Sequence, residues 1–240
     1  MRLTDFNVLT FDCYGTLIDW ETGLYEALQP LLRKGNITLE REHVLAAFAR
    51  HEAVQQAETP ERIYSDLLAE VHRLLAREWG IAASAEEHLR FGKSVPDWPA
   101  FPDTAAALKY LKRYYKLVIL SNVDRSSFSG TNLQLGVKFD AIYTAQDIGS
   151  YKPDPRNFQY MLEHLAALGV SKGQILHTAQ SLFHDHAPAN ALGLASAWID
   201  RRHQLEGWGA TAPPASTPRY DFRFTSLAAM ADAHEQELCA

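Results

Sequence analysis

The sequence predicts an α/β fold, in which a doubly wound parallel sheet carries an α-helical cap inserted after its first strand. Three observations lead to this prediction. From residue 97 onward, short apolar strands alternate with helices, which is typical of a parallel sheet covered on both faces. One further strand stands alone near the N-terminus. Between that strand and the others, residues 20–93 have helical periodicity and few strand signals.

The first predicted strand is Asn7–Asp12, with the sequence NVLTFD. It is short, apolar and rich in β-branched and aromatic side chains, and a turn containing Gly15 stops it. Asp12 therefore lies at the carboxyl end of a buried strand. Open α/β sheets bind their ligands beyond this edge, which makes Asp12 a candidate functional residue.

The inserted segment has apolar side chains at helical spacing, which predicts a block of two to four helices. These side chains are Leu24, Leu28, Leu31, Leu32, Val44, Ala47, Phe48, Leu67, Leu68, Val71, Leu74 and Leu75. The Pro-rich segment Ser94–Asp103 ends the helical block.

The rest of the chain supplies the remaining strands and the helices that cover them. The predicted strands are Lys116–Leu120, Phe139–Thr144, Gln174–Ala179 and Ala195–Ile199. The predicted helices are Thr104–Arg113, Pro155–Leu168 and His186–Leu192, and Gly207–Tyr220 is predicted to be a loop. The simplest architecture is a core of residues 1–17 and 97–240, interrupted by a helical cap of residues 18–96.

Composition and charge argue against several classes of protein. The net charge is −6 and no dense Lys/Arg block is present, so a nucleic-acid partner is not expected. No apolar run is long enough to span a bilayer, and the N-terminus lacks the features of a secretion signal. The two cysteines, Cys13 and Cys239, lie at opposite ends of the chain, which suits a reducing cytoplasm.

Polar side chains follow four of the predicted strands, at the points where those strands end. Because parallel strands bring their carboxyl ends to one edge of the sheet, these side chains are expected to converge there. A lysine near a carboxylate lowers its pKa and keeps it ionised, as a nucleophile must be. The converging residues are Asp12 and Thr16, Ser121 and Asn122, Lys152, and Asp185.

The segments that carry these residues resemble a known family. FDCYGTL, ILSNVD, YKPDP and AQSLFHDHAPANALG together resemble the four motifs of the haloacid dehalogenase superfamily of hydrolases. The resemblance runs over nearly the whole chain. It implies a Rossmann-like core, a mobile cap inserted after the first motif, and a nucleophilic aspartate at Asp12.

Tyr14 indicates which branch of the superfamily the chain resembles. In the phosphatases of the family a second acid follows the nucleophile by two residues and protonates the leaving alcohol, whereas this chain has Tyr14 there. A halide leaves without a proton. FDCYGTL is similar to the L-2-haloacid dehalogenases, which carry an aromatic residue here and use no metal. His184-Asp185-His186 cannot point three side chains at one site, so neither a metal nor another cofactor is expected.

The resemblance implies a role for each catalytic residue. Asp12 attacks C2 of the substrate and expels halide, and water near Asp185 and Lys152 then cleaves the resulting ester to give a 2-hydroxy acid of opposite hand. Thr16 orients Asp12, Lys152 keeps it charged, and Ser121 holds the substrate carboxylate.

The resemblance also implies a halide site, made by Asn122 and an arginine of the cap. Arg50, in FARHEAV, is the preferred candidate over Arg41 and Arg62. Tyr14 is expected at the substrate, and Trp98 is a further candidate for the pocket wall.

The fourth motif departs from the pattern of these dehalogenases. Gln180-Ser181-Leu182 stands where they carry Ser-x-Asn, so Ser181 or His184 is a candidate replacement for the missing polar groups.

The leading hypothesis is hydrolytic dehalogenation of a small halogenated carboxylic acid. Three alternatives stay open. Asp12 could open a strained ring beside a carboxylate, such as an azetidine; the chain could be a magnesium-dependent phosphatase or a phosphonatase; or the fold could serve as a binding module. A homodimer is also open, because relatives are often dimers.

Overall fold

The computed structural model describes residues 1–240 and has one sheet of six parallel strands, which confirms the predicted fold class. The strand order is β3-β2-β1-β4-β5-β6. The strands are β1 (Val8–Phe11), β2 (Lys116–Ser121), β3 (Ala141–Thr144), β4 (Ile175–Ala179), β5 (Ala195–Ile199) and β6 (Phe222–Phe224).

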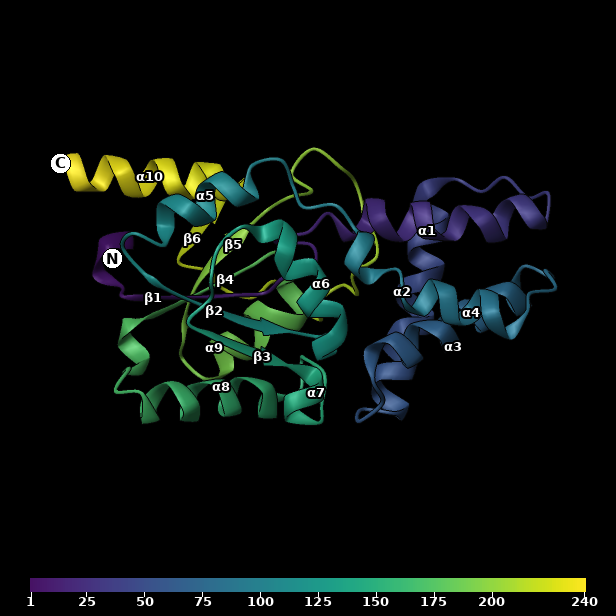
Figure 1. Cartoon of the computed structure of the whole chain (residues 1–240). Coiled ribbons are helices and arrows are strands. Elements are labelled where there is room, and N and C mark those ends of the chain that lie inside the picture. The colour runs from purple at the N-terminus through teal and green to yellow at the C-terminus, as the bar shows by residue number, and fades with distance from the viewer.

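Helices cover both faces of this sheet (Figure 1). Alternate residues of β2 face opposite sides, so Leu117 and Ile119 belong to one apolar cluster and Val118 and Leu120 to the other. Helices α5, α6 and α10 pack on the first side, and α8 and α9 pack on the second. The core helices are α5 (Thr104–Leu111), α6 (Arg125–Leu135), α7 (Ala145–Ile148), α8 (Pro155–Ala167), α9 (Ala187–Ala191) and α10 (Leu227–Cys239).

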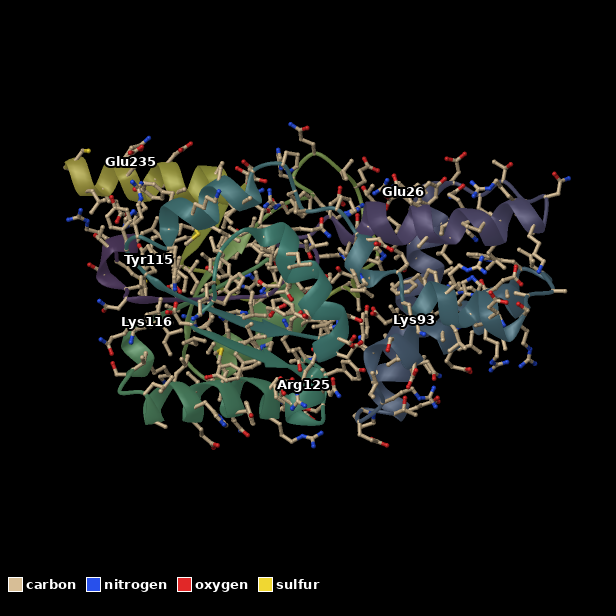
Figure 2. All side chains as sticks on the ribbon, in the orientation of Figure 1. Glu26, Lys93, Tyr115, Lys116, Arg125 and Glu235 are labelled. Atoms are coloured by element: carbon tan, nitrogen blue, oxygen red, sulfur yellow. The ribbon has the colours of Figure 1, made fainter.

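The inserted segment forms four helices that lie together beyond one end of the sheet (Figure 1). Figure 2 labels Lys116 at the start of β2 and Arg125 just past its end, which shows that the cap faces the carboxyl ends of the strands. The cap helices are α1 (Trp20–Lys34), α2 (Arg41–Glu58), α3 (Tyr64–Glu78) and α4 (Ala85–Gly92).

The structure departs from the predicted elements near the C-terminus. Strand β6 and helix α10 were not predicted. The alternation of β6, Phe-Arg-Phe, covers only three residues and is too short to mark a strand. Leu182–His186 forms a π-helical turn ahead of α9, where the sequence predicts a helix from His186. Cys13 and Cys239 are both free. No helix combines the length and the apolar character needed to cross a membrane.

Candidate active site

Asp12 immediately follows β1 and receives two hydrogen bonds from side chains. Thr16 donates to its Oδ2 at 2.8 Å, and the Lys152 ammonium donates to its Oδ1 at 2.9 Å. Gly15 has a φ of +93°, so the chain turns sharply between Asp12 and Thr16 in a conformation that L side chains avoid. The turn therefore brings Thr16 back to fix the rotamer of Asp12.

Lys152 is buried, and its ammonium has three acceptors. Besides Asp12, it donates to Asp185 Oδ1 at 2.7 Å and to the Leu120 carbonyl at 3.0 Å. The Asn122 amide pairs with the backbone of Lys152, accepting from its N–H at 2.7 Å and donating to its carbonyl at 3.0 Å. Asn122 thus ties the end of β2 to the loop that carries the lysine.

Asp185 lies in the π-helical turn that follows β4. His177 Nε2 donates to its Oδ1 at 2.9 Å, and His177 Nδ1 in turn accepts from Thr10 at 2.9 Å. The second oxygen, Oδ2, is buried and has no hydrogen-bond partner. Asp185 therefore keeps one acceptor free while the other is shared by a lysine and a histidine.

Burial and charge act differently on the three ionisable groups. Burial raises the pKa of the Asp12 carboxyl, and Lys152 lowers it as predicted but by less. The net pKa of Asp12 is therefore above its usual value, and the predicted net lowering is wrong. Burial also acts to raise the pKa of Asp185, but Lys152 and His177 outweigh it and hold that pKa well below its usual range. Burial favours a lower pKa for Lys152, and the two carboxylates outweigh it and raise that pKa.

A cavity of about 40 Å³ lies between this network and the cap. It has room for about three water molecules, which favours a small substrate. Core and cap both contribute to its walls. The lining residues are Asp12, Tyr14, Trp20, Glu52, Gln56, Tyr64, Ser121, Asn122, Lys152, Gln180, Ser181, His184, Asp185 and Thr211.

Four more of the sequence-predicted residues line this cavity. Ser121 Oγ is buried with no hydrogen-bond partner, so it can bind a ligand atom. The Tyr14 hydroxyl is hydrogen-bonded to Thr131 at 2.9 Å. His184 contacts Ser181 Oγ at 3.2 Å, and burial lowers the pKa of its imidazole to about 4, which keeps the ring neutral at pH 7.

Arg50 does not reach the cavity, and its predicted place at the halide is wrong in this structure. Its side chain is 57% exposed and pairs with Glu78 at 2.8 Å. The residues of α2 that line the cavity are Glu52 and Gln56, because a step of two residues along a helix turns the side chain by about 200°. The alternatives Arg41 and Arg62 do not line it either.

Trp98 is fully buried behind the cavity rather than in its wall. Its ring packs edge-on against Tyr14, with centroids 5.8 Å apart, and its indole N–H donates to Ser94 Oγ at 3.2 Å. It therefore supports the position of Tyr14 at the junction of core and cap.

The residues predicted from the sequence do not include Glu52, Gln56, Tyr64 or His177. A signal for Glu52 and Gln56 was available. They continue the buried stripe of α2 that includes Leu45 and Phe48, and a polar side chain on such a stripe is exceptional. His177 gave no comparable signal, since a histidine inside a strand is structural as often as it is functional.

The residues present do not fit a divalent cation. No three His, Cys, Asp or Glu side chains lie close enough together to hold a metal. The two acids that could begin such a site, Asp12 and Asp185, are bridged by the Lys152 ammonium. These side chains instead form an ion network centred on the Lys152 ammonium.

Known proteins resemble this chain in sequence and in fold. A model of the haloacid dehalogenase-like hydrolases matches residues 6–178. The chain belongs to this haloacid dehalogenase-like hydrolase family. An (S)-2-haloacid dehalogenase of Pseudomonas putida is 24% identical to it over 200 residues, covering 81% of this chain and 85% of the relative.

Solved structures show the same fold for this haloacid dehalogenase-like hydrolase. An L-2-haloacid dehalogenase aligns with a TM-score of 0.76 and 23% identity, covering 95% of this chain and 98% of that one. The L-2-haloacid dehalogenase from Xanthobacter autotrophicus aligns with a TM-score of 0.76 and 17% identity, covering 95% and 97%. At these identities the likeness concerns the fold.

Proposed function

We propose that this hydrolase removes halide from carbon 2 of a short 2-haloacid and leaves a 2-hydroxy acid. The observation that carries the proposal is Tyr14, which lines the cavity together with Asp12 and has its hydroxyl engaged by Thr131. A phosphatase of this family would need an acid at that position, whereas halide departs without a proton. The names of the relatives, which are 2-haloacid dehalogenases, support the same reaction.

In the first step, Asp12 attacks carbon 2 and halide leaves. Thr16 and Lys152 hold the carboxylate in place, and its burial favours attack because a desolvated carboxylate is a stronger nucleophile. The unpartnered Ser121 hydroxyl and the backbone N–H of Tyr14, which has no acceptor in the chain, are suited to bind the substrate carboxylate. The second amide hydrogen of Asn122 and the Trp20 indole are neutral donors for the halide.

In the second step, water cleaves the ester at the Asp12 carboxyl carbon. Asp185 Oδ2 is the free acceptor that can orient and deprotonate this water, while Lys152 and His177 hold the other oxygen. Attack opposite the departing halide inverts carbon 2, and hydrolysis at the enzyme's carboxyl group preserves that inversion in the product.

The test is a single turnover in heavy-oxygen water with 2-chloropropanoate, followed by mass spectrometry of the protein. We expect the label in the peptide that contains Asp12. Asp12→Asn should lower halide release by at least about 10⁴-fold. Asp232→Asn, which changes an exposed aspartate of α10, is the matched control and should release halide as the unmodified protein does.

Two results would reject this mechanism. Label that enters only the product would show direct attack by water. Magnesium-dependent hydrolysis of an aryl phosphate, without halide release from fluoro-, chloro- or bromo-acids, would instead favour the phosphatase alternative.

A further inference from the structure

The cap wall of the cavity carries a carboxyl group that the proposed dehalogenation does not use. Glu52 is only 5% exposed, yet it lines the cavity. Tyr64 donates to its Oε1 at 2.6 Å, and its Oε2 has no hydrogen-bond partner in the chain. No basic side chain contacts Glu52, and ionising a buried carboxyl group without a cation beside it is costly. Glu52 therefore offers a ligand an oxygen that no group of the chain uses.

The cavity has more acids than bases. Asp12, Glu52 and Asp185 line it, and Lys152 is the one lysine or arginine among the lining residues. All three N–H donors of Lys152 are engaged. A 2-haloacid adds the negative charge of its own carboxylate, which only neutral donors of the cavity can meet. A substrate that brings a cation with it therefore suits the cavity better than a simple anion.

The wall around Glu52 has the acceptors that such a cation needs. Gln56 lies one helical turn further along α2, and Thr211 comes from the loop that follows β5. Thr211 lies against α2, since it lines one pocket together with Ala49 and Ala53. The side chains of Gln56 and Thr211 have no hydrogen-bond partner in the chain. An ammonium group has three N–H donors, and three free oxygens are available on this wall.

We propose that the preferred substrate is a short 2-haloacid that carries an ammonium group on carbon 3, and that Glu52 binds this ammonium. The inference rests on the dehalogenation proposed above and names its substrate class. The cavity reaches from Asp12 of the core to Glu52 of the cap and has room for about three water molecules. One small molecule can therefore meet both side chains at once.

The ammonium group takes no part in the bonds that form and break. An Asp12 oxygen bonds to carbon 2, and the carbon–halogen bond breaks with its electron pair leaving on halide. Water then hydrolyses the Asp12 ester, which gives a 3-amino-2-hydroxy acid and releases one proton to the solvent. Glu52 stays ionised beside the ammonium throughout. It binds and orients the substrate without exchanging a proton with it.

The ionisation of Glu52 makes the preference depend on pH. Burial raises the pKa of this carboxyl to about 7, and the hydrogen bond from Tyr64 opposes the rise. Only the ionised form pairs with an ammonium, so the preference for the ammonium acid should rise with pH. The titratable and charged groups that face Glu52 are Tyr64 and, around the cavity, Asp12, Tyr14, Lys152, His184 and Asp185, with Tyr151 packed on Tyr64.

The experiment compares three chlorinated acids of equal size, which differ only in the group on carbon 3. They are 2-chlorobutanoate with a methyl, 2-chloro-3-hydroxypropanoate with a hydroxyl, and 3-amino-2-chloropropanoate with an ammonium. Chloride release gives kcat/KM for each, and NMR identifies 3-amino-2-hydroxypropanoate as the product of the third. A reaction without protein subtracts the chloride that the amino acid releases by closing on itself.

We expect Glu52→Gln to lower kcat/KM for the ammonium acid by about 10- to 100-fold, the range for a hydrogen bond to a charged group. The same variant should raise kcat/KM for the methyl acid, because it removes a carboxylate that repels the substrate anion. Each acid is compared with itself in two proteins, so its intrinsic reactivity cancels. Glu58→Gln, at the exposed end of the same helix, is the matched control and should leave all three values unchanged.

A pH profile separates charge recognition from a structural role of Glu52. In the unmodified protein, the ratio of kcat/KM for the ammonium acid to that for the methyl acid should rise about tenfold between pH 6 and pH 8. Asp12 and Lys152 act on both acids alike, so their titration does not change this ratio. Glu52→Gln should make the ratio independent of pH.

Each other outcome overturns the proposal. Equal use of the methyl and ammonium acids by the unmodified protein rejects the inference and leaves the proposed dehalogenation standing. Equal losses of the hydroxyl and ammonium acids in Glu52→Gln would show a hydrogen bond that does not depend on charge. Equal losses of all three would assign Glu52 a structural role. Release of chloride from none of the acids rejects the proposed function, and the inference falls with it.

Discussion

The core half and the cap half of the cavity differ in the partners of their buried acids. On the core side, Asp12, Lys152, Asp185 and His177 form a buried network in which the lysine satisfies both acids. On the cap side, Glu52 is equally buried but has a single neutral partner, Tyr64. In the core half, Lys152 therefore neutralises the carboxylates of Asp12 and Asp185. In the cap half, only a ligand or a proton can neutralise the carboxylate of Glu52.

The two halves of the cavity also differ in how their residues are held in place. Strand ends fix the core residues, because backbone hydrogen bonds along the sheet set their positions. Glu52 and Gln56 sit on α2, whose rotation decides which of its side chains line the cavity. A change in the cap can therefore alter this wall while Asp12 and Lys152 keep their positions.

The largest expected effect follows from breaking the core network. Lys152→Met should lower the free energy of unfolding by about 3 to 5 kcal/mol, because it leaves two buried carboxylates without their shared cation. Urea denaturation measures this. Lys93→Met is the control, since Lys93 is an exposed residue of the cap (Figure 2), and should change stability by no more than about 0.5 kcal/mol. Equal stability of the two variants would contradict the difference between the halves.

A smaller, pH-dependent effect is expected from the cap acid. The pKa of Glu52 is raised by burial from 4.5 to about 7, so between these values the unfolded chain binds fewer protons than the folded one. Stability from this group is therefore full below pH 4.5 and is lost as the pH rises to about 7. Glu52→Gln should gain about 1 to 3 kcal/mol of stability over the unmodified protein at pH 8.

Thermal unfolding of both proteins from pH 5 to pH 8 checks this prediction. Glu52→Gln keeps the acceptor for the Tyr64 hydroxyl, so the comparison isolates the charge. Parallel stability curves across this range would show that Glu52 is not desolvated in the folded protein.

The smallest effect is expected on the outer face of the cap. Arg50→Ala removes an exposed ion pair with Glu78 and should cost about 0 to 1 kcal/mol. Halide release should change by less than about threefold, because the side chain does not line the cavity. Steady-state kinetics with 2-chloropropanoate tests this. A loss of halide release above about tenfold would show that Arg50 acts at the site.

The core half of the site could be predicted from the sequence. Asp12, Ser121, Lys152 and Asp185 each follow a recognisable strand or its connecting loop, and a parallel sheet leaves their convergence little freedom. The alternation of strands and helices after residue 97 gave the fold class in the same way. These features depend on short-range patterns and on one topological rule.

Only the tertiary structure decided which face of α2 meets the core. Arg50 and Glu52 are two residues apart, and Glu52 lies on the same face of the helix as Phe48. This spacing groups the two side chains, but it does not show that their face lines the cavity. The packing of α2 against its neighbours sets that rotation, as it sets the burial that raises the pKa of Glu52. The sequence by itself therefore determined that Asp12 and Lys152 meet at the edge of the sheet, whereas long-range packing determined which side chains of α2 line the cavity.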